Sequence, residues 1–217
     1  MVFRGKNMDI PSLAEKRSGT VIRILEAAAS VFSEVGFAGA RVDEIADRAG
    51  VNKAMIYYHI GDKETLYAEV INNVIGNSAE TIACEIKDVD DPEEKLRIYI
   101  RTVARNIDDN PQVAPVMMRE VASGGKHLPE VVARDIFRIV NMLREILKEG
   151  EEKGIFIETI PFLIHIMVVG AIITYKTSAP IRARYDWLPE TIRNLDGRIS
   201  GNIAGEIEKL ILKAVKK

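Results

Sequence analysis

Residues 41–63, RVDEIADRAGVNKAMIYYHIGDK, predict two short helices joined by a tight turn. In the first, from Val42 to Ala49, small and apolar residues recur on one stripe at helical spacing. Gly50 can adopt a positive φ without a Cβ clash, so the chain can turn sharply there, and Asn52 is a suitable N-cap for the second helix. The pattern is that of a helix-turn-helix, a form in which proteins read DNA. We therefore expect sequence-specific DNA binding.

The second helix has an inward face and an outward face. Ile56 and Ile60 are four residues apart and are expected to face the first helix, where the small Ala46 allows close packing. The side chains left facing outward lie near the N-terminal half of the helix, where a recognition helix meets base edges. These side chains are Lys53, Ala54, Tyr57 and Tyr58.

The segment AGVNKAMIYYHIGDKETL, residues 49–66, resembles the signature of the TetR family of bacterial transcription regulators. The upstream segment ILEAAASVFSEVGFAGARVDEIA, residues 24–46, is also similar to that family, with Phe32, Gly36 and Phe37 at its usual positions. The resemblance covers roughly residues 18–66. Beyond it, only the length and the helical character of the chain agree with the family.

The resemblance implies a role in DNA contact for each matching position. Lys53 and Ala54 would touch base edges, and a lysine can donate to guanine O6 and N7. Tyr57 and Tyr58 would reach bases or phosphate, and the basic residues at the end of the run would hold the phosphate backbone. The predicted DNA-binding residues are Arg41, Asn52, Lys53, Ala54, Tyr57, Tyr58, His59 and Lys63.

Some of these positions also have a purely structural interpretation. Tyr58 and His59 would then pack on the first helix, and Lys63 would be a solvated residue of a first helical turn. The chain departs from the family at Ala40 and Arg41, where Thr or Ser pairs are usual, so the usual hydroxyl cap is missing. Arg41 is expected to supply a positive charge to phosphate instead.

Composition identifies an ordinary soluble globular protein, with 47% hydrophobic and 29% charged residues among 217. The net charge of −2 does not by itself indicate a nucleic-acid partner. A basic arm precedes the first helix, and its charges would suit phosphate contacts, although a merely solvated N-terminus explains them equally well. The single cysteine, Cys84, excludes an internal disulfide and fits a reducing cytoplasm. The basic residues of the arm are Arg4, Lys6, Lys16, Arg17 and Arg23.

Helical spacing and the positions of Pro and Gly predict an all-α chain. A first helix capped by Ser18 is expected to end at Gly36, and Asp62 is expected to cap a long helix that runs towards Ile86. The predicted domains are a helix-turn-helix DNA-binding domain with its arm over residues 1–62 and a helical effector-binding and dimerisation domain over residues 63–217. Later helices are predicted to begin at Pro92, Pro129, Pro161 and Ile203, the one after Pro129 closing at Gly150 or Gly154, with a Pro- and Gly-punctuated stretch over 180–201.

The apolar run 161–175 is about 15 residues long, short of the ~20 that a membrane span requires. We expect a helix that is buried against other helices and against a second subunit, and no membrane contact. No metal-ligand spacing joins the three histidines, and the chain has neither a P-loop nor a dinucleotide fingerprint. A binding protein without cofactor or metal, and not an enzyme, is therefore predicted.

The resemblance further implies a homodimer that binds a palindromic operator in double-stranded DNA and is released by a small-molecule effector, most often as a repressor. Flexible apolar and aromatic side chains on the central helices suggest an apolar or aromatic effector. The dimer contact is expected on the helix 161–175 and on the last helix, 203–215. The rival hypothesis is a helical small-molecule-binding or scaffold protein that has lost DNA binding. The predicted effector-binding residues, for which plain core packing is the alternative, are Met117, Met118, Phe137, Met142, Phe162, His165 and Tyr175.

Overall fold

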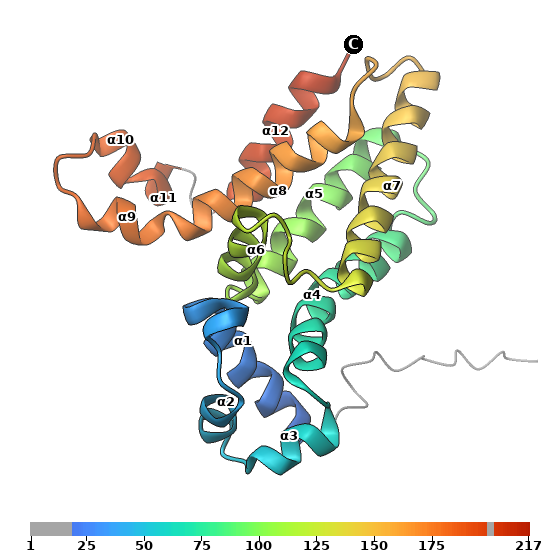
Figure 1. Ribbon diagram of the computed structural model, residues 1–217. Coiled ribbons are helices and arrows are strands. Elements are labelled where there is room, and N and C mark those ends of the chain that lie inside the picture. Colours follow the sequence, from blue (N-terminus) through green and yellow to red (C-terminus); the bar gives the residue numbers. More distant parts are fainter. Residues whose placement is uncertain (1–18, 199–201) are drawn as a thin grey trace, which may run out of the picture.

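The computed structural model describes residues 19–198 and 202–217, and the regular elements of these residues are helices (Figure 1). This confirms the all-α prediction. Ser18 and all of the predicted basic arm except Arg23 lie outside the described residues. The helices are α1 (Gly19–Gly39), α2 (Val42–Ala49), α3 (Lys53–His59), α4 (Lys63–Glu85), α5 (Pro92–Asp109), α6 (Val113–Ala122), α7 (Glu130–Glu152), α8 (Pro161–Thr177), α9 (Ala179–Arg184), α10 (Glu190–Arg193), α11 (Leu195–Arg198) and α12 (Ile203–Val215).

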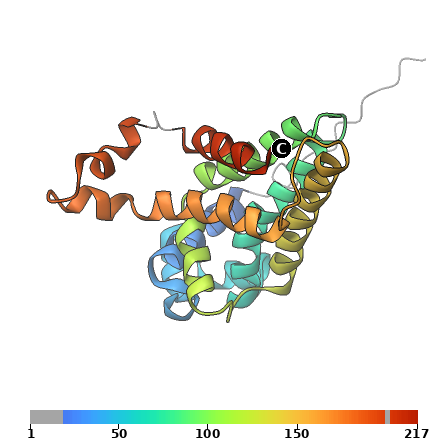
Figure 2. The same ribbon diagram turned by 90° about the horizontal axis from the view of Figure 1, so that it is seen from above.

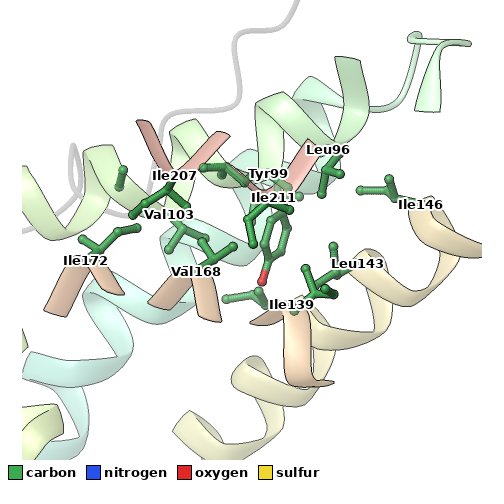
Figure 3. Close-up of a cluster of buried hydrophobic side chains, with 14 of the residues drawn as sticks. Leu96, Tyr99, Val103, Ile139, Leu143, Ile146, Val168, Ile172, Ile207 and Ile211 are labelled. Atoms are coloured by element: carbon green, nitrogen blue, oxygen red, sulfur yellow. The ribbon is translucent and has the colours of Figure 1, made fainter. Parts of the chain in front are cut away.

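Two apolar cores organise these helices. The first, which we call the reader core, joins α1, α2 and α3 to the N-terminal half of α4 and receives Val116 from α6 and Val132 from α7. The second, the regulatory core, is formed by the C-terminal half of α4 with α5, α7, α8 and α12. Figure 3 shows Tyr99 of α5 surrounded by branched aliphatic side chains of these helices. Helix α4 therefore belongs to both cores.

The local signals that were read from the sequence explain most helix boundaries. Gly36 has a φ of 72° and interrupts the regular part of α1, while Gly50 has a φ of 64° and closes α2 in the left-handed conformation. The Asn52 side chain accepts a hydrogen bond from the backbone N–H of Met55 and caps α3. Asp62 caps α4 in the same way through the N–H of Thr65.

The end of α7 decides between the two glycines that were predicted to close it. The helix continues through Gly150 to Glu152, and Gly154, with a φ of 70°, makes the turn. Gly150 serves a packing role instead, because the Phe156 ring lies against its backbone. A Cβ atom at Gly150 would lie 2.0 Å from Cδ2 of that ring, far inside van der Waals contact.

The C-terminal third departs from two expectations. The stretch predicted as punctuated loop contains the short helices α9, α10 and α11, since Pro180 and Pro189 stand at the starts of helices, where proline is tolerated. The apolar helix is also less buried than expected. Helices α8 and α9 together form a run of 24 residues, Pro161–Arg184, whose length and apolar composition would suffice to cross a membrane. The rest of the protein buries only 28% of the most apolar window of this run.

We predict that Gly150→Ala destabilises the fold. Overpacking typically costs about 1–3 kcal/mol, and we expect the upper end because the Phe156 ring must leave its place. This loss exceeds the ~1 kcal/mol that alanine gains over glycine in a helix. Chemical denaturation monitored by circular dichroism measures the change. Gly19→Ala, where nothing lies within 4 Å of the new atom, is the matched control, and equal stabilities of the two variants would contradict the prediction.

Candidate nucleic-acid interface

A three-residue ionic network fixes α2 against α1. The Arg48 guanidinium donates to both carboxylate oxygens of Glu34, at 2.6 and 2.8 Å, and to Glu44 at 2.6 Å. The Arg48 guanidinium, helped by the Ser30 hydroxyl, lowers the pKa of Glu34 from 4.5 to about 2. A bidentate arginine–carboxylate pair is directional as well as attractive. The network therefore adds a directional contact between α2 and α1 at the surface of the apolar core that the two helices share.

Helix α3 presents the outward face that the sequence predicted. Ile56 is fully buried, whereas Lys53, Ala54 and Tyr57 are exposed and Tyr58 is 85% exposed. The ammonium group of Lys53 lies 3.0 Å from the carboxylate of Asp43 on α2, so in the free protein its charge is partly balanced. The exposure of Tyr58 argues against its packing on the first helix of the pair.

The remaining predicted contact residues differ in their surroundings. His59 and Asn52 are exposed at the two ends of α3, and Arg41 is exposed at the N-cap of α2, where its side chain makes no capping hydrogen bond. Lys63 is partly buried, with its Nζ 4.5 Å from the centre of the Phe37 ring. Lys63 thus has a packing role within the reader core, whatever else it contacts.

Helix α6, which the sequence did not reveal, connects the reader core to the rest of the molecule. Its Glu120 is 4% exposed and accepts hydrogen bonds from the Tyr67 hydroxyl at 2.6 Å and from the backbone N–H of His127 at 3.1 Å. Arg119 donates to the carbonyl of Glu34 at 2.8 Å, near the break in α1. Sequence reasoning missed α6 because Pro115 interrupts its pattern and the helix has only ten residues.

Of the seven residues predicted to bind an effector, Phe162 and His165 of α8 lie together, with their ring centres 6.3 Å apart. Met118, Phe137 and Phe162 are exposed, whereas Met117 and Met142 are partly buried against the cores. Of the seven residues, Tyr175 alone lines either of the two cavities described, the one of about 690 Å³ between α8 and the segment α9–α11. The effector-binding set stays a prediction.

His165, the polar residue on the apolar helix α8, has a hydrogen-bond partner within the protein. Its Nδ1 lies 2.6 Å from the hydroxyl of Tyr99, within the regulatory core. Burial lowers the pKa of His165 from 6.5 to about 4, so the ring is neutral at pH 7. Among residues 19–198 and 202–217, no three His, Cys, Asp or Glu side chains are placed to hold a metal ion.

Two family models of bacterial regulatory proteins match the two parts of the chain. Residues 24–70 match the family described as "Bacterial regulatory proteins, tetR family", and residues 92–182 match "Tetracyclin repressor-like, C-terminal domain". The HTH-type transcriptional repressor NicS of Pseudomonas putida is 27% identical over 192 residues, covering 81% of this chain and 90% of that protein.

Solved structures of regulators have the same fold. A linker-substituted mutant of HlyIIR superposes with a TM-score of 0.68 at 25% identity, covering 91% of this chain and 96% of that one. The fatty acid degradation regulator FadR from Bacillus halodurans superposes with a TM-score of 0.65, also at 25% identity and over the same shares of the two chains.

We predict that His165 makes stability depend on pH. Because its pKa is about 4 in the folded protein and 6.5 when unfolded, the unfolded state binds the proton more readily. The contribution of the neutral His165 ring to the free energy of unfolding is fully present above pH 6.5 and is lost as the pH falls towards 4. Denaturation of the wild type and of His165→Gln, which keeps an acceptor for Tyr99, should give free energies whose difference changes across this window. A constant difference would contradict the prediction.

Proposed function

The chain belongs to the TetR family of bacterial regulatory proteins and is a ligand-responsive DNA-binding transcription regulator, and we propose that it represses by binding a palindromic operator as a homodimer through α3. The relative NicS, named a transcriptional repressor, supports repression over activation. We infer a cytoplasmic location, where the chromosome is accessible, and no enzymatic activity.

The observation that carries the proposal for α3 is the combination of a fully buried Ile56 with an exposed basic and aromatic face. Tyr58 exposes most of a large side chain, and Tyr57 about half of one. Such side chains gain a partner when the helix enters the major groove, where Lys53 can donate to guanine. Arg41, His59 and Lys63 would contact phosphates, which position the helix without reading sequence.

A second copy of the chain is the proposed partner of the exposed face of α8. Figure 2 shows α8 and α12 side by side, with the short helices extending beyond them. Large apolar side chains remain uncovered on α8 and on α12, where Leu210 is 67% exposed. A two-fold interface there would bury them and place two copies of α3 on two half-sites, about one DNA turn (~34–36 Å) apart. The exposed side chains are Phe162, Leu163, Ile166, Met167 and Leu210.

We further propose that the effector is a small apolar or aromatic molecule held in the domain of residues 63–217. The name of the structural relative from Bacillus halodurans, a fatty acid degradation regulator, is consistent with an apolar compound. The proposed contacts remain Met117, Met118, Phe137, Met142, Phe162, His165 and Tyr175. An effector releases the operator only if it binds the released state more tightly, and a coupling of about 1–3 kcal/mol is typical.

We predict that Lys53→Ala combined with Tyr57→Ala abolishes specific operator binding. Each lost base contact costs about 1–3 kcal/mol, and the dimer loses each contact twice, so affinity should fall more than about 100-fold. Fluorescence anisotropy with a palindrome selected from genomic fragments measures the affinity. Wild-type binding should weaken steeply with salt because phosphate contacts release counterions. Lys87→Ala, an exposed lysine beyond α4, is the control and should bind normally. Normal operator binding by the double variant would mean that this face of α3 does not read the operator, whereas a wild type that binds no specific DNA would favour the scaffold hypothesis.

We predict that Ile166→Glu combined with Leu210→Glu converts the dimer to a monomer. A carboxylate that must be buried without a partner destabilises an interface strongly, whereas on a free surface it costs little. Light scattering after size-exclusion chromatography gives the mass, and the monomer should bind the palindrome weakly. Val121→Glu, at an apolar residue of α6 that is 75% exposed, is the control. A dimer that survives both substitutions on α8 and α12 would place the interface elsewhere.

A further inference from the structure

A cavity of about 500 Å³ opens between α1, α4 and the turn that joins α5 to α6. Cavities of this size hold small organic ligands. None of the residues predicted from the sequence to bind the effector lines it. The cavity is therefore a site separate from the effector site proposed above.

One part of the cavity wall is apolar and built from the interior of the molecule. Val74 of α4 and Val113 of α6 are each 4% exposed, yet neither belongs to the reader core or the regulatory core. Val70 from the reader core lies beside them, and Ile22 and Leu25 of α1 complete this part of the wall. These side chains offer a surface for the apolar body of a ligand.

The polar part of the wall carries negative charge and no balancing positive charge. Glu26 of α1 and Asp109 at the end of α5 line the cavity, and neither carboxylate forms a hydrogen bond or ion pair with the part of the chain that the structure describes. No Lys, Arg or His lines the cavity. By contrast, the partly buried carboxylates Glu93 and Glu94 of α5 are paired with arginine or lysine.

Neutral amides complete the polar lining. Asn73, Asn110 and Gln112 are the amide side chains in the cavity. The Asn110 side-chain nitrogen donates a hydrogen bond to the backbone carbonyl of Asn106 at 2.9 Å. The Asn110 side-chain oxygen is therefore left as an acceptor. Two carboxylates and an amide oxygen are acceptors, so the lining matches a ligand that donates hydrogen bonds and carries positive charge.

We propose that this cavity binds an organic cation with an apolar body, such as a protonated arylalkyl amine. The ammonium group lies between Glu26 and Asp109, and the hydrocarbon part lies against Val74 and Val113. An organic anion is disfavoured because two carboxylates would repel it and no cation would offset the repulsion. The ligand contacts α1 of the reader core and the α5–α6 turn together. This proposal does not depend on the proposed operator or dimer.

The test uses the full-length protein without DNA and three probes: 2-phenylethylamine, the uncharged 2-phenylethanol, and phenylacetate. Chemical shifts of labelled Ile, Leu and Val methyl groups report both the affinity and the place of binding. We expect the amine to bind most tightly, with shifts concentrated at Ile22, Leu25, Val70, Val74 and Val113. Phenylacetate should bind weakest of the three.

The variants test the role of the two carboxylates. Glu26→Gln combined with Asp109→Asn should weaken binding of the amine about fivefold to tenfold, as expected for two partly solvated ionic contacts, and should leave 2-phenylethanol unchanged. Both carboxylates are exposed and unpaired, so the variant should melt at the wild-type temperature. Glu80→Gln combined with Asp88→Asn makes the same change of net charge outside the cavity and should bind as the wild type does.

Three results would overturn the proposal. The first is equal affinity for the amine and the alcohol, which would mean that charge is not recognised. The second is an equal loss in the control variant, which would mean that only net charge matters. The third is a set of chemical-shift changes at methyl groups other than those of Ile22, Leu25, Val70, Val74 and Val113, which would place binding elsewhere.

Discussion

Helix α4 belongs to both apolar cores, and this shared helix is the constraint on which the rest of the structure depends. Leu66 and Ile71 of its N-terminal half lie in the reader core, whereas Ala79 and Ile82 lie in the regulatory core. A continuous hydrogen-bonded helix transmits displacement because it does not bend without a local cause. The buried hydrogen bond between Tyr67 and Glu120 ties α6 to the same helix. These two elements are the physical connection between the regulatory core and the reader core.

This architecture explains how a ligand at a distance can control DNA binding. Helix α6 contributes Val116 to the reader core, and Met117 packs against both cores. Glu120 is a buried carboxylate whose partners lie on α4 and on the loop after α6, so moving α6 would leave its charge without hydrogen bonds.

Local residue chemistry made the helix-turn-helix predictable. Gly50, Asn52 and Asp62 act through their own backbone or that of residues within three positions, so turn and caps follow from the sequence alone. Contacts between segments distant in the chain were not predictable. Nothing in the sequence links His165 to Tyr99, 66 residues away, or assigns Gly150 to the Phe156 ring. The predicted effector residues stay a prediction, because a spacing pattern shows which side chains share a helix face, and not which helices enclose a space.

By itself, the sequence determined the helical class, the reader helix with its exposed Lys53, Tyr57 and Tyr58, and the start of α4, because each follows from periodicity, capping or a positive φ. Only the tertiary structure decided that α8 is largely uncovered, that α6 joins the two cores, and that Glu26 and Asp109 face one cavity. An apolar helix has the same composition whether its own chain or another molecule covers it. Which of these occurs depends on how many neighbouring helices the fold supplies, and in the run from α8 to α9 they bury only 28% of the most apolar window.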